Sequence, residues 1–468
     1  MNAFVQAAMQ LPDSVTENGA ATFASSLDPH VDLFFRVGAS RGKIPQVLSL
    51  FWSAFKADRA LATRIALWAR DARGGAGERE IFRAILKQLP EDVQLKLFDK
   101  IVELGRWDDL EVLIESGSAV VQVYAANYWK RAVLDGHGLA AKWAPRKGAL
   151  AAKIRGLWGM TPKQYRKTLV NATNVVETQM CAKQWNDIEF AHVPSVAAAR
   201  YNKAFLKNAA EAYQAYKESL VKGETKINAG AIFPHDVVRA VGMSVDTDVI
   251  DAQWKALPDF CNGKASDILV MSDVSGSMMT PVSGATTALQ VSVALGLYIS
   301  ERQTGPFKDL VLTFHTNPTF HKVQGTGIVD RIQNLSHAAW GGSTDLNKAF
   351  RLVLKTAVDN KVAAGDMPKV LLVLSDMEFN HCGVMTNTQV LRKLYAEAGY
   401  EMPKLVFWNL NSRSQNVPVR AGEDGVALVS GFSPAVLKSV LAAEDFSPVG
   451  IMLETVMSDR YAVPGVTA

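Results

Sequence analysis

Residues 267–277 read DILVMSDVSGS: an apolar run that ends in a carboxylate and two hydroxyl side chains. Short uninterrupted apolar runs are typical of strands that are buried on both faces of a parallel sheet. Four similar runs follow it, separated by helical patterns: DLVLTFHT at 309–316, KVLLVLSDMEF at 369–379, KLVFWNL at 404–410 and GVALVSGF at 425–432. This alternation predicts a doubly wound α/β domain.

The first half of the chain has a helical period instead. Residues 48–73, for example, place apolar side chains at i, i+3, i+4 and i+7. Breaks at Gly105 and Gly117 help to divide this half into segments of roughly 15 to 20 residues, as in helix-pair solenoids of the HEAT type. We therefore expect a multidomain α plus α/β protein, with a HEAT-like all-α array over residues 1–250 and the α/β domain over residues 264–468.

The net charge, the cysteines and the hydropathy of the chain exclude several classes of protein. The 468 residues carry a net charge of only +4, so affinity for nucleic acid must come from a local patch. The three cysteines, Cys181, Cys261 and Cys382, are far apart and predict neither a disulfide framework nor a zinc site. The first residues lack the features of a signal peptide, and no apolar run has the length of a membrane span. We expect a cytoplasmic protein without membrane contact.

Three predicted strand-to-helix loops carry hard oxygen donors. Asp273, Ser275 and Ser277 follow the first strand, Thr344 precedes a predicted helix, and Asp376 ends the predicted strand at 369–376. Aspartate and serine are common in turns, where they often only cap helices. The carboxyl ends of parallel strands, however, lie at one edge of the sheet, where such folds build ligand sites. The pattern therefore favours an octahedral Mg²⁺ or Mn²⁺ site.

This arrangement resembles the von Willebrand factor A domain, a Rossmann-like fold, and its metal-ion-dependent adhesion site. The resemblance implies that the three hydroxyls approach the cation, and that the two aspartates act directly or through water. It also implies a vacant coordination position that takes a carboxylate of a protein partner. The sequence departs from the family at Met377, where many such domains have glycine, which leaves the shape of the third loop open. Asp345 is expected to cap the next helix, with Ser343 as an alternative hydroxyl donor.

The helical half contains a strongly basic segment. Residues 136–176 include eight basic side chains and no aspartate or glutamate: Lys142, Arg146, Lys147, Lys153, Arg155, Lys163, Arg166 and Lys167. Trp143, Trp158 and Tyr165 lie among them. Basic and aromatic side chains together suit phosphate neutralisation and base stacking on RNA. The alternative is a solvated helical surface whose aromatic rings point into the core.

Several further segments precede the α/β half, and their order matches that of a known protein family. Among them are Arg70 to Arg79, Gly105 to Leu110 and Phe233-Pro234-His235. Together they resemble the TROVE module of the Ro ribonucleoprotein autoantigen family, and a related group of uncharacterised plant, bacterial and phage proteins. The resemblance implies a HEAT-like ring closed by the A-type domain, which binds small structured noncoding RNAs and the ends of misfolded RNAs. It implies that Lys142, Arg146, Arg166 and Lys167 match basic positions of the family. From the local charge we expect RNA to bind the basic segment through Lys142, Arg146, Lys147, Arg155, Lys163, Arg166 and Lys167.

Other polar residues of these segments are expected to be structural. Arg73 and Arg79 are placed to hold the glycine-rich turn through Asp71 or Glu78. Trp107, followed by two aspartates, is expected to begin a helix and to pack against the core.

These observations predict a noncatalytic RNA-binding scaffold with a Mg²⁺-dependent adhesion site for an acidic protein partner. The alternative is a protein–protein adhesion or assembly module that binds no RNA. We expect no enzyme, because the sequence contains no nucleophile with an adjacent base, no phosphate-binding P-loop and no HExxH zinc motif.

Overall fold

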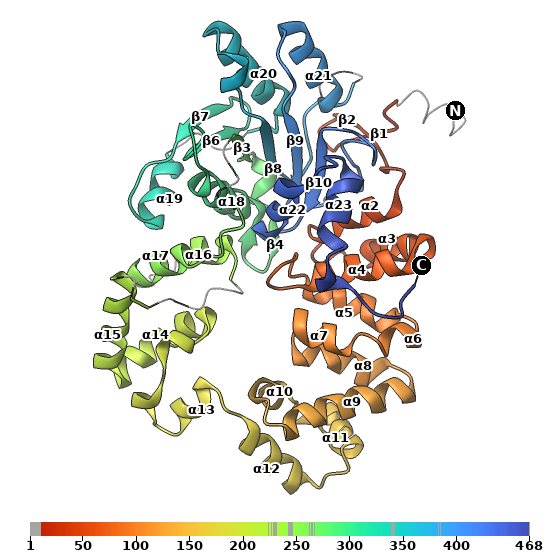
Figure 1. Ribbon diagram of the computed structural model, residues 1–468, viewed down its shortest axis with the longest axis vertical. Helices are drawn as coiled ribbons and strands as arrows, with labels where there is room; N and C mark the ends of the chain where they lie inside the picture. Colours follow the sequence, from red (N-terminus) through yellow and green to blue (C-terminus); the bar gives the residue numbers. More distant parts are fainter. Residues whose placement is uncertain are drawn as a thin grey trace.

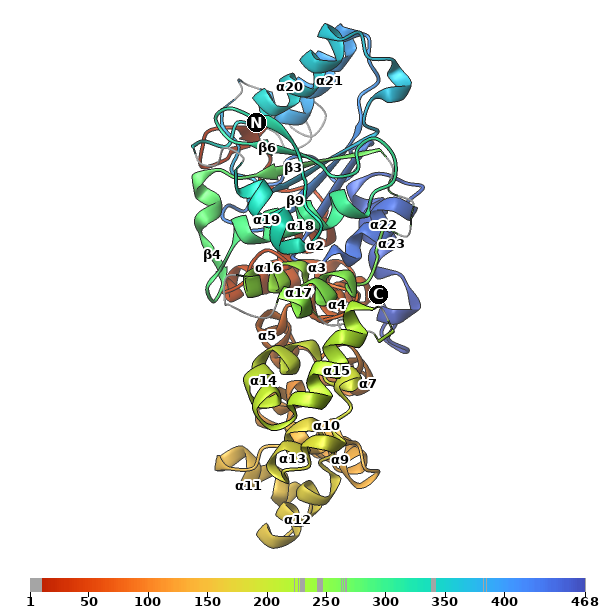
Figure 2. The same ribbon diagram turned by 90° about the vertical axis from the view of Figure 1, so that its left-hand side faces the viewer.

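The computed structural model describes residues 11–222, 224–225, 227, 232–241, 247–261, 263, 265, 267–337, 342–381, 383 and 385–467. Cys382 and part of the predicted boundary between the two halves therefore lie outside the described residues. Figure 1 shows a helical array that leaves the sheet at α2, passes through α9–α12 at the far end of the molecule and returns at α16 and α17. Array and sheet together enclose a ring, which is narrow when viewed from the side (Figure 2). None of the helices in the described part of the chain is long and apolar enough to span a membrane.

The second half is built on a six-stranded mixed sheet with strand order β10-β9-β8-β3-β6-β7. All six residues of β3 are buried, and Val270 pairs with Val311 on one side and Leu372 on the other. The five predicted strands are parallel and buried, whereas β7 is an antiparallel edge strand whose exposed TFHK sequence gave no apolar signal. The strands are β3 (Ile268–Asp273), β6 (Leu310–Phe314), β7 (Thr319–Lys322), β8 (Val370–Ser375), β9 (Lys404–Asn409) and β10 (Val426–Ser430).

Helices flank this sheet, which confirms the predicted fold class. The most deeply buried of them is α18, which packs against β3 and begins with a capping box of Thr287 and Gln290. The helices of this half are α18 (Ala288–Arg302), α19 (Ile328–Ser336), α20 (Leu346–Asp359), α21 (Asn387–Ala398), α22 (Leu437–Ala442) and α23 (Pro448–Val456).

The first half is helical, as its periodicity predicts, and its helices end at the predicted breaks. Gly105 and Gly117 directly follow α7 and α8. The helices are α2 (Pro29–Val37), α3 (Ile44–Ala57), α4 (Arg59–Arg70), α5 (Arg79–Gln88), α6 (Glu91–Gln94), α7 (Phe98–Leu104), α8 (Glu111–Ser116), α9 (Ala119–Leu134), α10 (Gly138–Trp143), α11 (Gly148–Leu157), α12 (Pro162–Ala172), α13 (Val176–Cys181), α14 (Ser195–Asn208), α15 (Ala210–Val221), α16 (Pro234–Val241) and α17 (Thr247–Lys255).

The N-terminal segment packs on the sheet rather than on the array. A short hairpin of β1 (Ser14–Val15) and β2 (Ala21–Thr22) precedes Phe23, which forms a β-bridge with Val417. Helix α2 then lies against β10, where the Ser430 hydroxyl donates to the Phe34 carbonyl at 2.7 Å. The domain limits of 1–250 and 264–468 stay a prediction. The structure shows, in addition, that the first residues of the predicted helical half pack against the sheet.

His235 lies where α16 meets the sheet half. Its side chain is buried, with its ring stacked on Phe233 and edge-on to Phe432 at centroid distances of 5.6 and 5.3 Å. Its Nδ1 atom has no hydrogen-bond partner among the described residues. Burial lowers the pKa of His235 to about 4, so the folded protein favours the neutral imidazole.

We expect this histidine to contribute to acid destabilisation. Between about pH 6.5 and pH 4 the unfolded chain binds a proton that the folded chain excludes, so stability falls as the pH is lowered. The loss is at most about 3 kcal/mol for a pKa difference of this size. His235→Phe keeps an aromatic ring and should flatten the decrease in Tm between pH 7 and pH 4. Thermal denaturation of wild type and variant measures this, and identical pH profiles would contradict it.

Candidate functional site

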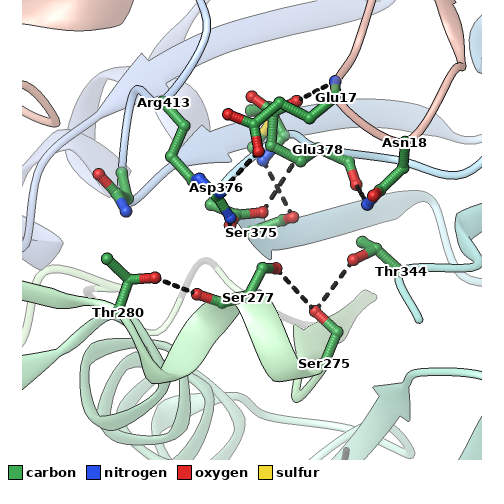
Figure 3. Close-up of polar contacts among 12 residues, drawn as sticks. Glu17, Asn18, Ser275, Ser277, Thr280, Thr344, Ser375, Asp376, Glu378 and Arg413 are labelled. Atoms are coloured by element: carbon green, nitrogen blue, oxygen red, sulfur yellow. Dashed lines mark hydrogen bonds and ion pairs between the residues drawn. The ribbon is translucent and has the colours of Figure 1, made fainter. Parts of the chain in front are cut away.

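The three predicted oxygen-bearing loops meet at the carboxyl ends of β3 and β8 (Figure 3). The hydroxyl of Thr344 donates to the Ser275 hydroxyl at 3.0 Å, and the Ser275 and Ser277 hydroxyl oxygens are 3.2 Å apart. The Ser375 hydroxyl, at the end of β8, donates to Asp273 Oδ2 at 2.5 Å. Residues from three segments far apart in the sequence therefore form one cluster of oxygen atoms.

The backbone fixes the first loop. Asp273 is the last residue of β3 and is fully buried, and its Oδ1 accepts the Ser275 amide at 3.0 Å. The next amide, of Gly276, donates to the Gly342 carbonyl at 3.0 Å and so joins the first loop to the second. These contacts hold the Ser275 hydroxyl toward Thr344.

The second loop lies between helices α19 and α20, so the prediction that it follows a strand is wrong. It presents one of its two candidate hydroxyls to the cluster. Asp345 caps α20, as predicted, by accepting the Lys348 amide at 2.9 Å. The Ser343 hydroxyl accepts the Asn380 side-chain amide at 2.9 Å instead of joining the cluster. Thr344 is therefore the hydroxyl donor of this loop.

The third loop keeps a left-handed turn without glycine. Met377 has φ of +67°, a conformation that side chains other than glycine rarely adopt. Its amide donates to the Ser375 hydroxyl at 3.1 Å, and the Glu378 amide donates to Asp376 Oδ1 at 3.3 Å. The substitution that left the loop shape open in the sequence is therefore accommodated by local hydrogen bonds.

Glu378 is a residue that sequence analysis did not select. Its side chain is buried, and its two carboxylate oxygens accept the Glu17 amide at 2.7 Å and the Ser414 amide at 3.1 Å. Asn18 also donates, through its side chain, to the Glu378 carbonyl at 2.6 Å. The N-terminal hairpin thus holds the third loop in place. No sequence signal links residues that are about 360 positions apart.

The two aspartates experience an unusual electrostatic environment. Burial, with the negative charge of Asp376 nearby, raises the pKa of Asp273 to about 7. Burial also raises the pKa of Asp376, although a hydrogen bond with Ser277 and the charge of Arg413 act in the opposite direction. The Arg413 guanidinium lies 3.8 Å from Asp376 Oδ2, and this oxygen accepts no hydrogen bond from the described residues.

This donor set fits a hard divalent cation. Two buried carboxylates and three clustered hydroxyls, with one carboxylate oxygen that accepts no hydrogen bond from the described residues, offer the all-oxygen ligands that Mg²⁺ and Mn²⁺ prefer. A cation there would be held by all five predicted residues. It would also offset the cost of burying two negative charges side by side.

The basic segment lies at the end of the molecule farthest from the sheet (Figure 2). On α12, the exposed side chains of Lys163, Arg166 and Lys167 have i, i+3 and i+4 spacing and therefore share one face. Tyr165 and Leu169 bury the opposite face against the core. Two other predicted residues are less available to a ligand, because Arg155 is half-buried and the exposed Arg146 donates a hydrogen bond to Thr173. Lys147 is exposed just before α11.

The aromatic side chains favour the structural alternative. Trp158 and Tyr165 are buried, and they donate to the carbonyls of Ala126 at 2.8 Å and Pro145 at 2.9 Å. They are therefore not available for base stacking. Trp143 is only half-buried.

Lys142 is partly neutralised by a residue just beyond the basic segment. Its ammonium lies 2.8 Å from the Glu177 carboxylate. Burial acts to raise the pKa of Glu177, but the hydrogen bond from Lys142 contributes to a net lowering. A charge count that stops at residue 176 misses this partner.

Comparisons with known proteins cover almost the whole chain. Residues 16–91 and 147–262 match a domain of unknown function, DUF2828, and residues 267–460 match a second, DUF7788. An uncharacterized protein of Acanthamoeba polyphaga mimivirus is 31% identical over 94% of this chain and 86% of its own length. The crystal structure of the Ro (RSR) protein of Deinococcus radiodurans aligns with 87% of this chain and 93% of its own, at 17% identity and a TM-score of 0.45. The oxygen cluster lies within the DUF7788 match, and α12 lies within the DUF2828 match.

Proposed function

This chain belongs to the same family as the mimivirus protein, and we propose that it is a noncatalytic scaffold that binds RNA and a protein partner at two separate sites. RNA binds the basic face at the end of the helical array. A divalent cation, Mg²⁺ or Mn²⁺, binds the oxygen cluster at the sheet edge and accepts an acidic group of the partner.

The observation that carries the RNA proposal is the basic face of α12. Lys163, Arg166 and Lys167 are exposed on one side of a single helix, and none has a salt bridge with another described residue. Three adjacent cations without counter-charges attract phosphates, and the attraction does not depend on base sequence. The sequence segments that resemble the Ro family imply the same ligand: small structured or misfolded noncoding RNA.

The cation proposal rests on the geometry of the oxygen cluster. The Ser275 hydroxyl lies 3.2 Å from that of Ser277 and 3.0 Å from that of Thr344, beside two buried carboxylates. Mg²⁺ commonly keeps part of its shell for water or a ligand oxygen, so a partner carboxylate can complete the coordination.

The RNA proposal predicts a change in salt dependence when the basic face is removed. The triple variant Lys163→Ala, Arg166→Ala and Lys167→Ala should bind a structured RNA with single-stranded tails about ten- to a hundredfold more weakly near 0.1 M salt. Each lost phosphate contact lowers the log–log salt slope by roughly 0.7, so the slope should decrease by up to about 2. Filter binding at four salt concentrations measures both quantities.

A matched control removes the same charge elsewhere. Arg351, Lys355 and Lys393 are exposed on α20 and α21, at the opposite end of the molecule (Figure 1). Their triple alanine variant should bind RNA like wild type. If the two triple variants behave alike, the basic face is only a solvated surface.

A protein–protein assembly module that binds no RNA is the second candidate function, because the oxygen cluster does not depend on the helical array for any of its five predicted ligands. Sequencing of nucleic acid that copurifies with the native protein separates the two. A defined set of copurifying RNAs would support the RNA-binding scaffold. If no such set is found, the adhesion module is favoured.

A further inference from the structure

A pocket of about 290 Å³ lies beside the oxygen cluster, and neither the sequence nor the comparisons assign it a ligand. It forms where the loop between α2 and α3 meets the loop after β9 and the chain after Ser277. Its lining side chains include Glu17, Arg41, Lys43, Thr280, Arg413 and Phe432. The helical half and the α/β half therefore both contribute to this pocket.

Two residues connect the pocket with the cation site. The Arg413 guanidinium contacts the Glu17 carboxylate at 2.5 Å and also lies 3.8 Å from Asp376 Oδ2 (Figure 3). The Thr280 hydroxyl donates to the Ser277 carbonyl at 2.7 Å. Two residues that line the pocket therefore contact residues of the oxygen cluster directly, so the two sites are neighbours.

Positive charges outnumber negative charges in the lining of the pocket. Three cationic side chains face one carboxylate, that of Glu17. Arg413 pairs with that carboxylate, and Arg41 pairs with the buried Glu78 at 2.5 Å. Lys43 donates to the Ser412 carbonyl and makes no salt bridge within the described part of the chain. Lys43 is therefore the lining cation that has no salt bridge among the described residues, although the carboxylates of Glu17, Glu378 and Asp376 lie near enough to act on its charge.

A half-buried ammonium without a carboxylate partner favours an anionic ligand. Burial and the charge of Arg413 lower the pKa of Lys43, and the carboxylates of Glu17, Glu378 and Asp376 offset this lowering only in part. The volume is at the lower end of the range for small-molecule sites and accommodates an acidic side chain. Phe432 is buried beneath Arg41, which lies 4.1 Å above its ring, and it closes one side of the pocket.

We propose that this pocket binds a second acidic group of the protein partner, so that the partner presents two neighbouring carboxylates, one to the cation and one to Lys43. This inference rests on the proposed cation site and names the ligand class of that site. It predicts a preference for dicarboxylates over monocarboxylates.

The test uses Mn²⁺ with small carboxylates as probes. Mn²⁺ bound to the full-length protein is followed by water-proton relaxation, and butyrate or glutarate is titrated to displace its bound water. Wild type should bind glutarate roughly tenfold more tightly than butyrate, the gain expected for one charge-assisted contact. Lys43→Gln should lose that preference while keeping its Mn²⁺ affinity, and Lys43→Arg should retain the preference.

Lys56, exposed at the other end of α3, gives the matched control, and Lys56→Gln should behave like wild type. If Lys43→Gln and wild type bind Mn²⁺ normally and show the same ratio of glutarate to butyrate affinity, the pocket proposal is overturned while the cation site stands. If wild type binds no Mn²⁺, the cation site and the two-carboxylate ligand both fail. If inorganic phosphate displaces glutarate at equal concentration, the pocket binds anions in general. This result would overturn the proposed preference for carboxylates.

Discussion

Replacing Asp273 should weaken Mn²⁺ binding by at least about a hundredfold, the largest functional effect that we expect of one substitution. Asp273 is fully buried at the end of β3, and its carboxylate is held by the Ser275 amide and the Ser375 hydroxyl. Asp273→Asn keeps the shape of the side chain but removes the charge that attracts the cation. Asp273→Ala should have the same effect. Calorimetric titration with Mn²⁺ measures both variants.

The fold should survive this change. The pKa of Asp273 is raised to about 7 by burial and by Asp376, so between about pH 4 and pH 7 the folded protein binds a proton that the unfolded chain releases. Stability of the metal-free protein therefore falls through this group as the pH rises. Asparagine does not ionise, so its variant does not lose stability in this way as the pH rises. The Tm of metal-free Asp273→Asn should therefore be no lower than that of wild type at pH 8.

A surface substitution controls for charge. Asp359, exposed at the end of α20, pairs with Lys355, and Asp359→Asn should leave Mn²⁺ binding unchanged. Mn²⁺ affinity of a folded Asp273→Asn equal to that of wild type would refute the assignment of the site.

Replacing Asp109 should cost about 3 to 5 kcal/mol of folding free energy, the largest stability effect that we expect. Its carboxylate is fully buried and accepts both Nε and Nη2 of Arg70, at 2.8 and 2.6 Å. It also accepts the Arg106 amide at 3.1 Å, and Arg79 approaches its other oxygen at 3.4 Å. Asp109→Asn leaves a buried guanidinium without its full counter-charge.

Urea denaturation followed by circular dichroism measures this loss. Asp92 pairs with Arg59 at 2.8 Å on the surface, and Asp92→Asn should cost less than about 1 kcal/mol. The double variant Arg70→Met with Asp109→Leu should recover part of the stability, because it removes both buried charges. Equal unfolding free energies for Asp109→Asn and Asp92→Asn would contradict the role assigned to the buried pair.

The prediction that Arg73 and Arg79 hold the glycine-rich turn with their side chains is wrong, since the Arg73 guanidinium donates to the Glu103 carbonyl. Arg79 is structural, yet it pairs with Asp108 at 2.6 Å instead of holding the glycine-rich turn. Asp71 of that turn binds Arg460 at 2.5 Å, near the other end of the chain. The charge pattern of a sequence shows that pairs exist, but it does not select between carboxylates that the fold brings equally close.

The strands and helices were predictable because hydrophobic periodicity is local. Five strands carry apolar runs that only a sheet covered on both faces can bury, and the breaks at Gly105 and Gly117 end helices where they were expected. Edge strand β7 was missed because an exposed strand needs no apolar pattern.

By itself the sequence determined which loops carry the two aspartates, since the carboxyl ends of parallel strands lie at one edge of the sheet. The loop with Thr344 follows helix α19 instead of a strand, and only the folded chain brings it to that edge. Only the tertiary structure decided which donors meet. It selected Thr344 over Ser343, and it brought Glu17 to the Glu378 side chain. It also buried Trp158 while leaving the cationic face of α12 in solvent. The physical reason is that periodicity fixes each element from neighbouring residues, whereas pairing and burial depend on residues that approach only when the whole chain is folded.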